Sequence, residues 1–128
     1  MAVTTEFLDK LAYVHVDAAQ LQQVVLNLIR NAIDAMGSSA PDTQRLRLTT
    51  KIGERSTVLI SIQDTGPRIA AEDRERIFDA FFTTKTAGMG LGLAISRTIV
   101  ERHEGSLRLL QSDPTGSIFE IGLPTNSD

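Results

Sequence analysis

Apolar residues recur at helical spacing between Ala18 and Met36, and this is the clearest pattern in the chain. The apolar positions are Leu21, Val24, Val25, Leu28, Ile29, Ala32, Ile33 and Met36. Such spacing places an apolar stripe along one side of a helix. Asp17 precedes the segment as a natural N-cap, and Gly37 follows it as a glycine of the kind that ends helices. The pattern therefore predicts a helix over residues 18–36.

Alternating apolar and polar residues predict the strands of a sheet. The predicted strands lie at 13–16, 45–52, 58–64, 107–110 and 118–123, and two further helices are predicted at 71–78 and 91–103. Because hairpins are mixed with helices, the order favours a two-layer α/β sandwich. We expect a mixed, mostly antiparallel sheet that packs against three helices.

Composition narrows the class of protein. A chain of 128 residues suits one domain, which we place at 13–124, with a linker or an artificial start at 1–12 and a tail at 125–128. The net charge of −3 gives no basic surface for nucleic acid or anionic lipid, and the absence of cysteine excludes disulfides and Cys-based zinc sites. No apolar run approaches the roughly 20 residues of a membrane span. We expect no direct membrane contact and a cytoplasmic location, whether or not a parent protein is anchored in a membrane.

Asn27 and Asn31 lie four residues apart in the predicted helix, so both amides project from one face. Two asparagines on a helix surface need no special function, and this interpretation stays open. The alternative is that an amide oxygen helps to hold Mg²⁺, which takes oxygen ligands together with the phosphates of a substrate.

The sequence Asp-Thr-Gly-Pro-Arg-Ile at 64–69 directly follows a predicted strand. A carboxylate followed by Gly-Pro can be no more than a turn. It can equally be a buried acceptor for an amino group on a base, with a glycine that lets a ring approach the backbone.

The sequence Gly-Met-Gly-Leu-Gly-Leu at 88–93 leads into a predicted helix. Glycines there leave backbone N–H groups free to face phosphate, which the helix dipole also favours. The spacing differs from the dinucleotide-binding fingerprint, and the Gly-Lys-Ser/Thr of a P-loop is absent. A flexible loop before a helix is the simpler alternative, and we expect residues 83–90 to be mobile.

These motifs occur in a specific order: Asn-x-x-x-Asn-Ala, Asp-x-Gly, Phe-Phe-Thr-Thr-Lys at 81–85, and the glycine motif at 88–93. The order resembles the Bergerat-fold ATPase and kinase superfamily, and within it the N, G1, F and G2 boxes of sensor histidine kinases. The last two motifs are most similar to the nitrogen- and oxygen-sensing branch. The resemblance covers residues 17 to about 124, and it implies the ATP-binding catalytic domain of a two-component sensor histidine kinase.

The resemblance also implies a role for each matching position. Asn31 would bind Mg²⁺, while Asn27 and Lys85 would act as catalytic residues near the phosphates of ATP. Asp64 would accept a hydrogen bond from the adenine amino group, and Ser117 would help to hold adenine through water. The complete implied nucleotide site is Asn27, Asn31, Asp64, Gly66, Ile69, Phe78, Lys85, Gly88, Met89, Gly90, Leu91, Gly92, Leu93 and Ser117.

One position separates the subfamilies. Relatives such as gyrase carry a glutamate four residues before the metal-binding asparagine, where it activates water. Here that position is Asn27, whose amide cannot act as a general base at neutral pH. The γ-phosphoryl group is therefore expected to pass to a protein side chain, which favours a kinase.

Three residues depart from the family pattern: Arg68 replaces the second glycine of the G1 box, Arg74 replaces a leucine, and Ala80 replaces a proline. If position 68 needs a positive φ, a non-glycine residue there costs roughly 1 kcal/mol. A degenerate module that binds nucleotide without catalysis is therefore one alternative.

The phospho-accepting histidine of a sensor kinase lies on a separate helical dimerisation domain. His15 falls in a predicted strand and His103 near a helix end, so we expect both to be structural. The expected partners are a histidine-containing dimerisation domain and a response regulator, with the isolated domain a monomer. A stand-alone serine kinase of the anti-sigma-factor type is the second alternative, which the Phe-Phe-Thr-Thr-Lys motif argues against.

Overall fold

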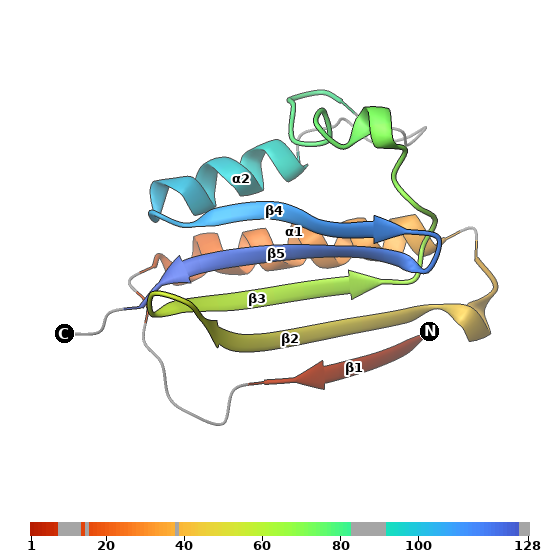
Figure 1. Cartoon of the computed structure of the whole chain (residues 1–128), viewed down its shortest axis with the longest axis horizontal. Coiled ribbons are helices and arrows are strands. Elements are labelled where there is room, and N and C mark those ends of the chain that lie inside the picture. Colours follow the sequence, from red (N-terminus) through yellow and green to blue (C-terminus); the bar gives the residue numbers. More distant parts are fainter. Residues whose placement is uncertain (8–13, 15, 38, 83–91, 126–128) are drawn as a thin grey trace.

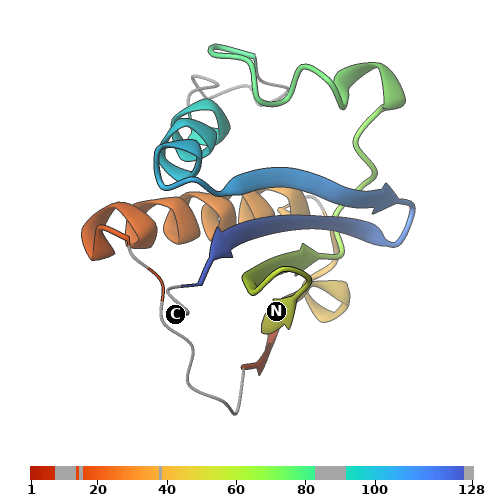
Figure 2. The same cartoon turned by 60° about the vertical axis from the view of Figure 1, so that its left-hand side comes forward.

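The computed structural model describes residues 1–7, 14, 16–37, 39–82 and 92–125. A sheet with the strand order β1-β2-β3-β5-β4 carries two α-helices against the same face (Figures 1 and 2). The strands are β1 (Ala2–Glu6), β2 (Arg45–Gly53), β3 (Thr57–Asp64), β4 (Ser106–Asp113) and β5 (Gly116–Pro124). The helices are α1 (Ala18–Met36) and α2 (Gly92–Arg102), with short 3₁₀ turns η1 (Pro41–Thr43) and η2 (Ala71–Asp73). The predicted two-layer sandwich is confirmed.

Strand pairing brings the end of β3 next to the turn between β4 and β5 (Figure 1). β2, β3, β5 and β4 pair in antiparallel fashion, and β1 pairs in parallel with β2. The sheet is therefore mixed and mostly antiparallel, as predicted. In this register Asp64, the last residue of β3, lies opposite Ser117 near the start of β5.

Helix α1 has the predicted bounds. Asp17 has extended φ and ψ angles, and its side chain accepts a hydrogen bond of 3.1 Å from the backbone N–H of Gln20, as an N-cap does. At the other end, Gly37 keeps right-handed helical angles, with φ −59° and ψ −26°, and its N–H donates to the carbonyl of Asp34. The glycine thus ends the helix without the left-handed conformation common at this position.

The prediction of a helix at 71–78 is wrong. Residues 71–78 form only the 3₁₀ turn η2 and a series of further turns. A helix of two turns has too few hydrogen bonds to offset its nucleation cost unless packing supports it. Here the packing fixes Ile77, which is buried, and leaves Glu75 and Arg76 exposed.

No helix in the described part of the chain is long and apolar enough to cross a membrane.

The N-terminal segment contains a strand that the pattern did not predict. Ala2–Glu6, which lie in the range 1–12 expected to be a linker, form β1 and pair with residues 45–49 of β2. All of its residues are exposed, so it has no alternation of buried and exposed positions. The strand predicted at 13–16 is described only in part, where Val14 forms an isolated bridge with Thr125.

The hydrophobic core lies between the sheet and the two helices. Its buried members are Val24, Leu28, Ala32, Met36, Leu46, Ile62, Ile77, Ile99, Val100, Leu107, Phe119, Ile121 and Leu123. Ile69, Phe78 and Leu93, which the resemblance assigns to the nucleotide site, pack against this core and are partly buried. These three residues therefore also stabilise the fold.

His103 joins the end of α2 to the start of α1. Its Nδ1 lies 2.8 Å from the carbonyl oxygen of Ile99, and its Nε2 accepts a 3.1 Å hydrogen bond from the backbone N–H of Asp17. A carbonyl only accepts, so Nδ1 donates to Ile99 and Nε2 is the acceptor for Asp17. The structural role expected of His103 agrees with these contacts, while His15 lies outside the described residues.

Candidate nucleotide site

Asp64 is buried at the end of the central strand β3, with 3% of its surface exposed. Its Oδ1 accepts a 2.8 Å hydrogen bond from the backbone N–H of Gly66. Burial raises the pKa of the Asp64 carboxyl above its ordinary value of 3.8, while hydrogen bonds from the backbone of Gly66 and Ser117 act in the opposite direction. A buried carboxylate held by two backbone donors has its orientation fixed, and its remaining lone pairs can accept from a ligand.

Gly116 allows the β4–β5 turn to approach Asp64 closely. Its φ is +137°, a conformation that side chains rarely adopt. A Cβ at this position would overlap the carbonyl oxygen of Asp64 and would lie 2.8 Å from the carbonyl carbon and 2.9 Å from the Cα of Thr65. The turn can therefore pack here only with glycine. Sequence reasoning did not assign this role to Gly116, although its place in an Asp-Pro-Thr-Gly turn was a signal.

A pair of buried serines connects this turn to the loop after β3. The Oγ atoms of Ser112 and Ser117 lie 2.8 Å apart, and the backbone N–H of Ile69 donates to the Oγ of Ser112 at 2.9 Å. Both serines are at least 95% buried. Ser112 was missed by the sequence analysis because its position near the end of β4 carries no motif. The contacts bring together four predicted site residues: Asp64, Gly66, Ile69 and Ser117.

Gly66 places the same loop against α1. A Cβ at Gly66 would lie 2.9 Å from the carbonyl oxygen of Ala35 and 3.0 Å from its carbonyl carbon. The glycine is therefore required for the approach of a helix, in addition to any approach of a base. Asn31 lies one turn before Ala35 on α1 and is partly buried, so the proposed metal ligand is on the helix that contacts this loop.

Asn27 faces the second helix. Its Nδ2 donates a 3.3 Å hydrogen bond to the Oγ of Ser96, which is completely buried on α2. This contact joins the N-box helix to the helix that follows the glycine motif. Sequence reasoning missed Ser96; the signal was a lone hydroxyl on the buried side of α2, between Leu93 and Ile99.

The remaining predicted residues divide into two groups. Lys85, Gly88, Met89, Gly90 and Leu91 lie outside the described residues, as does the whole segment 83–90 expected to be mobile. Gly92 is the exposed first residue of α2, and a Cβ added to it would lie in open space. Phe78 packs edge-to-face against Phe119, with ring centroids 6.1 Å apart.

The site's donor set fits Mg²⁺ held partly by a substrate. The described residues contain no group of three or more His, Cys, Asp or Glu that could hold a metal ion. Mg²⁺ usually keeps several waters and uses few protein ligands together with substrate phosphates. The amide oxygen of Asn31 is a suitable hard ligand, so a single amide beside a triphosphate is chemically sufficient.

Comparison with known proteins identifies the family. The profile of the histidine kinase-, DNA gyrase B- and HSP90-like ATPases matches residues 16–127. The chain belongs to this family. The family predicted from the order of the motifs is thereby confirmed, and the match covers nearly the whole chain.

Two of its curated relatives are sensor histidine kinases. The chain is 36% identical over 119 residues to the sensor histidine kinase TmoS of Ectopseudomonas mendocina, covering 92% of this chain and 12% of TmoS. It is 39% identical over 118 residues to the sensor histidine kinase ZraS of Escherichia coli K12, covering 92% of this chain and 24% of ZraS. The chain therefore spans at most a quarter of these two relatives.

Solved structures of histidine kinases have a similar fold. The catalytic domain of the histidine kinase ThkA, in a nucleotide-free form, superposes with a TM-score of 0.81 at 34% identity, over 96% of this chain and 78% of that one. ThkA in complex with the response regulator protein TrrA matches with a TM-score of 0.78 at 30% identity, over 97% of this chain and 34% of the ThkA chain. This family member thus has the fold of a histidine kinase catalytic domain.

Proposed function

We propose that this chain is the ATP-binding catalytic domain of a two-component sensor histidine kinase. It transfers the γ-phosphoryl group of ATP to a histidine on a separate dimerisation domain of the parent protein. The observation that carries the proposal is the buried, oriented carboxylate of Asp64, held at the end of β3 by the N–H of Gly66 and approached by the glycine turn at 116.

The adenine end of the site is proposed to lie at Asp64. A carboxylate accepts hydrogen bonds and donates none, so it suits the exocyclic amino group of adenine. Ser117 lies opposite Asp64 in the sheet and shares a hydrogen bond with Ser112, which leaves its hydroxyl at least one lone pair for a bridging water. Ile69, partly buried beside these groups, supplies apolar surface for the base.

The phosphate end is proposed to lie along α1 and the glycine motif. Asn31 would hold Mg²⁺, which when bound neutralises charge on the phosphates. Asn27 is oriented by Ser96, and we propose that it positions the terminal phosphate. Lys85 and the backbone of residues 88–92 would contact the phosphates by charge and by N–H donors.

Transfer to a protein side chain is favoured over hydrolysis. Neither Asn27 nor Ser96 can remove a proton from water at neutral pH, so this pair offers no general base for hydrolysis. Transfer then depends mainly on holding ATP in line with an acceptor that another domain presents. The proposed partners follow: a dimerisation domain with the acceptor histidine, and a response regulator, as in the ThkA complex with TrrA. We propose a cytoplasmic location and a monomeric isolated domain.

Arg68 does not favour the alternative of a degenerate module. Within the described residues, the non-glycine positions with positive φ are Arg55, Ser56, Phe81 and Glu104. Arg68 is not among them, and it is exposed. The strain that its replacement of a glycine could have introduced is therefore absent.

The test is phosphoryl transfer in the parent protein. Incubation with Mg²⁺ and γ-labelled ATP should give acid-labile, alkali-stable label on the parent kinase, and none when the acceptor histidine is replaced with glutamine. The isolated domain should hydrolyse ATP very slowly. Rapid ATP hydrolysis by the isolated domain, or acid-stable label typical of phosphoserine, would contradict the proposal.

A further inference from the structure

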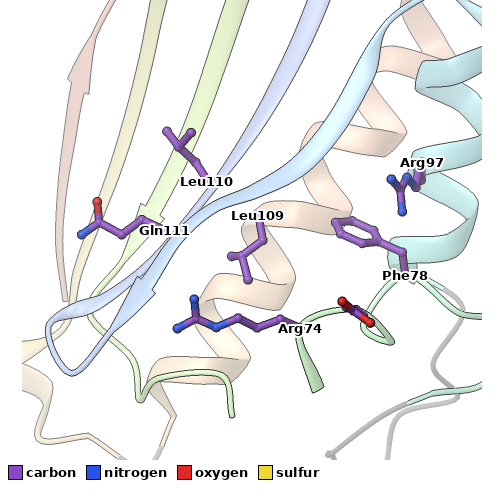
Figure 3. A pocket seen from close by; sticks show the side chains of 7 residues that line it. Arg74, Phe78, Arg97, Leu109, Leu110 and Gln111 are labelled. Atoms are coloured by element: carbon purple, nitrogen blue, oxygen red, sulfur yellow. The ribbon is translucent and has the colours of Figure 1, made fainter. Parts of the chain in front are cut away.

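Strand β4 contains a β-bulge at Leu110, which changes the side of the sheet that its later residues face. Leu109 lies opposite Phe119 of β5, and Gln111 lies opposite Ile118, so Leu110 is the extra residue between them. Figure 3 shows the consequence: Leu109 points to one side of β4, whereas Leu110 and Gln111 both point to the other. An extra residue of this kind reverses the facing of every later position in the strand.

The bulge places Ser112 beside the adenine end of the proposed site. Ser112 lies opposite Ser117 of β5, and Ser117 lies opposite Asp64 of β3. Without the extra residue in β4, Gln111 would stand opposite Ser117. Directly opposed residues project from the same face of a sheet, so the carboxylate and the two hydroxyls form one polar row across three strands. Each member of the row keeps only 3% to 5% of its surface exposed.

Ser112 is held from two directions by the segment that follows β3. Its hydroxyl accepts a 2.9 Å hydrogen bond from the backbone N–H of Ile69, and its carbonyl accepts a hydrogen bond from Nη2 of Arg74. The side chain of Arg74 extends toward β4 in Figure 3. These two bonds fix Ser112, and its Oγ lies 2.8 Å from the Oγ of Ser117. Ser112 therefore orients the hydroxyl next to Asp64.

The two serines carry one hydroxyl proton more than their hydrogen bonds use. They have two hydroxyl protons, and the bond between the two oxygens uses one of them. The second proton has no acceptor among the described residues, because the other contact of the pair is the N–H of Ile69, which donates. Buried donors are nearly always paired with protein, water or ligand. The row thus offers an acceptor at Asp64 beside one unused donor.

We propose that Ser112 is a specificity-determining positioning residue for adenine. It fixes the hydroxyl of Ser117 so that the serine pair donates, directly or through a bridging water, to N1 of the base. This inference rests on the proposed function, which places the 6-amino group of adenine at Asp64. Adenine presents a donor, the amino group, beside an acceptor, N1, and the row presents an acceptor beside a donor. The match covers two adjacent atoms of the base, of which Asp64 reads one.

Calorimetric titration with ADP and 1-deaza-ADP tests this role. In 1-deaza-ADP a C–H group replaces N1 and the amino group is kept, so the parent domain should bind it roughly tenfold more weakly than ADP. In Ser112→Ala the Ser117 hydroxyl loses the contact that orients it, so ADP should bind more weakly and the ratio of the two affinities should fall to about twofold or less. A loss of stability alone would leave this ratio unchanged.

Two variants serve as controls. Ser112→Thr keeps the hydroxyl and should keep the parental ratio. Ser106→Ala is the matched control, because this exposed serine lies at the other end of β4, opposite Gly122. Neither affinity should change in that variant.

Equal affinities of the parent domain for ADP and 1-deaza-ADP would overturn the inference, as would a parental ratio in folded Ser112→Ala. If Ser112→Ala fails to fold, Ser112→Cys takes its place, because a thiol is a weak hydrogen-bonding group and the ratio should again fall. A parental ratio in Ser112→Cys would then overturn the inference. Either result leaves the proposed function intact, whereas failure of the parent domain to bind ADP would overturn both.

Discussion

Replacing Gly116 with alanine should destabilise the domain and its nucleotide site together. The new Cβ would overlap the carbonyl oxygen of Asp64 and lie within 2.9 Å of two further atoms of residues 64 and 65. All of these are backbone atoms, so no side chain can rotate away and the turn must move from β3. The positive φ adds to this cost, because side chains rarely adopt it.

The magnitude follows from two terms. Strain at an unfavourable backbone conformation costs about 1–3 kcal/mol. Loss of the backbone hydrogen bond from Ser117 to the Asp64 carboxylate adds about 1 kcal/mol. The expected loss in free energy of unfolding is therefore about 2–4 kcal/mol, a large part of the roughly 5–15 kcal/mol of a typical domain.

Urea unfolding followed by circular dichroism measures this loss. Gly92→Ala is the matched control, because no atom lies within 4 Å of a Cβ there and the residue is helical. That variant should be as stable as the parent domain or more stable by up to about 1 kcal/mol. If Gly116→Ala unfolds at the same urea concentration as Gly92→Ala, the close approach of the turn to Asp64 is wrong.

Three further predictions concern the site. Burial raises the pKa of Asp64, so the folded state binds the proton of this carboxyl more tightly than the unfolded chain does. The protonated carboxyl therefore stabilises the fold below the ordinary pKa of 3.8, and this stabilisation is lost as pH rises through the raised pKa. The stability of the parent domain relative to Asp64→Asn should therefore fall with rising pH in urea titrations from pH 3.5 to 8, and a difference constant with pH would contradict the shift. Ser96→Ala should lower kcat for phosphoryl transfer more than it changes KM, because Asn27 loses the acceptor that orients its amide. The same loss should lower the free energy of unfolding by about 1 kcal/mol. An unchanged kcat would exclude Ser96 as a positioning residue. Asn31→Ala should abolish the Mg²⁺ dependence of ATP binding in calorimetry while the circular dichroism spectrum stays unchanged, and retained dependence would exclude Asn31 as the metal ligand.

Local patterns predicted the elements whose stabilising contacts are also local. Helix α1 has the predicted bounds because its apolar stripe and its Asp17 cap lie within one continuous segment. The hairpin of β2 and β3 followed from alternation on two adjacent runs. By contrast, β1 is an exposed edge strand with no alternation to detect, and the short helix predicted at 71–78 depends on packing that the sequence does not show.

The candidate site was predictable where motifs are contiguous. Asp64 and Gly66 belong to one motif, and the structure places them in one hydrogen-bonded turn. Ser112 and Ser96 were not predictable, because each acts through a partner distant along the chain, Ile69 for the first and Asn27 for the second. Such pairs appear only when the fold has been formed.

The most direct test of the account is base selectivity at Asp64. Adenine offers an amino group to this carboxylate, whereas guanine places a carbonyl oxygen at the same position, so two acceptors would face each other. An unpaired buried polar group costs about 1–3 kcal/mol, or about one to two decades in affinity. Calorimetric titration of the domain with ADP and GDP in Mg²⁺ measures the difference.

We expect ADP to bind at least tenfold more tightly than GDP, and Asp64→Ala to lose most of the ADP affinity. Asp42→Ala, which removes an exposed carboxylate from η1, is the matched control and should bind ADP as the parent domain does. Equal affinities for ADP and GDP, or unchanged ADP binding by a folded Asp64→Ala variant, would contradict the assignment of Asp64 as the adenine acceptor.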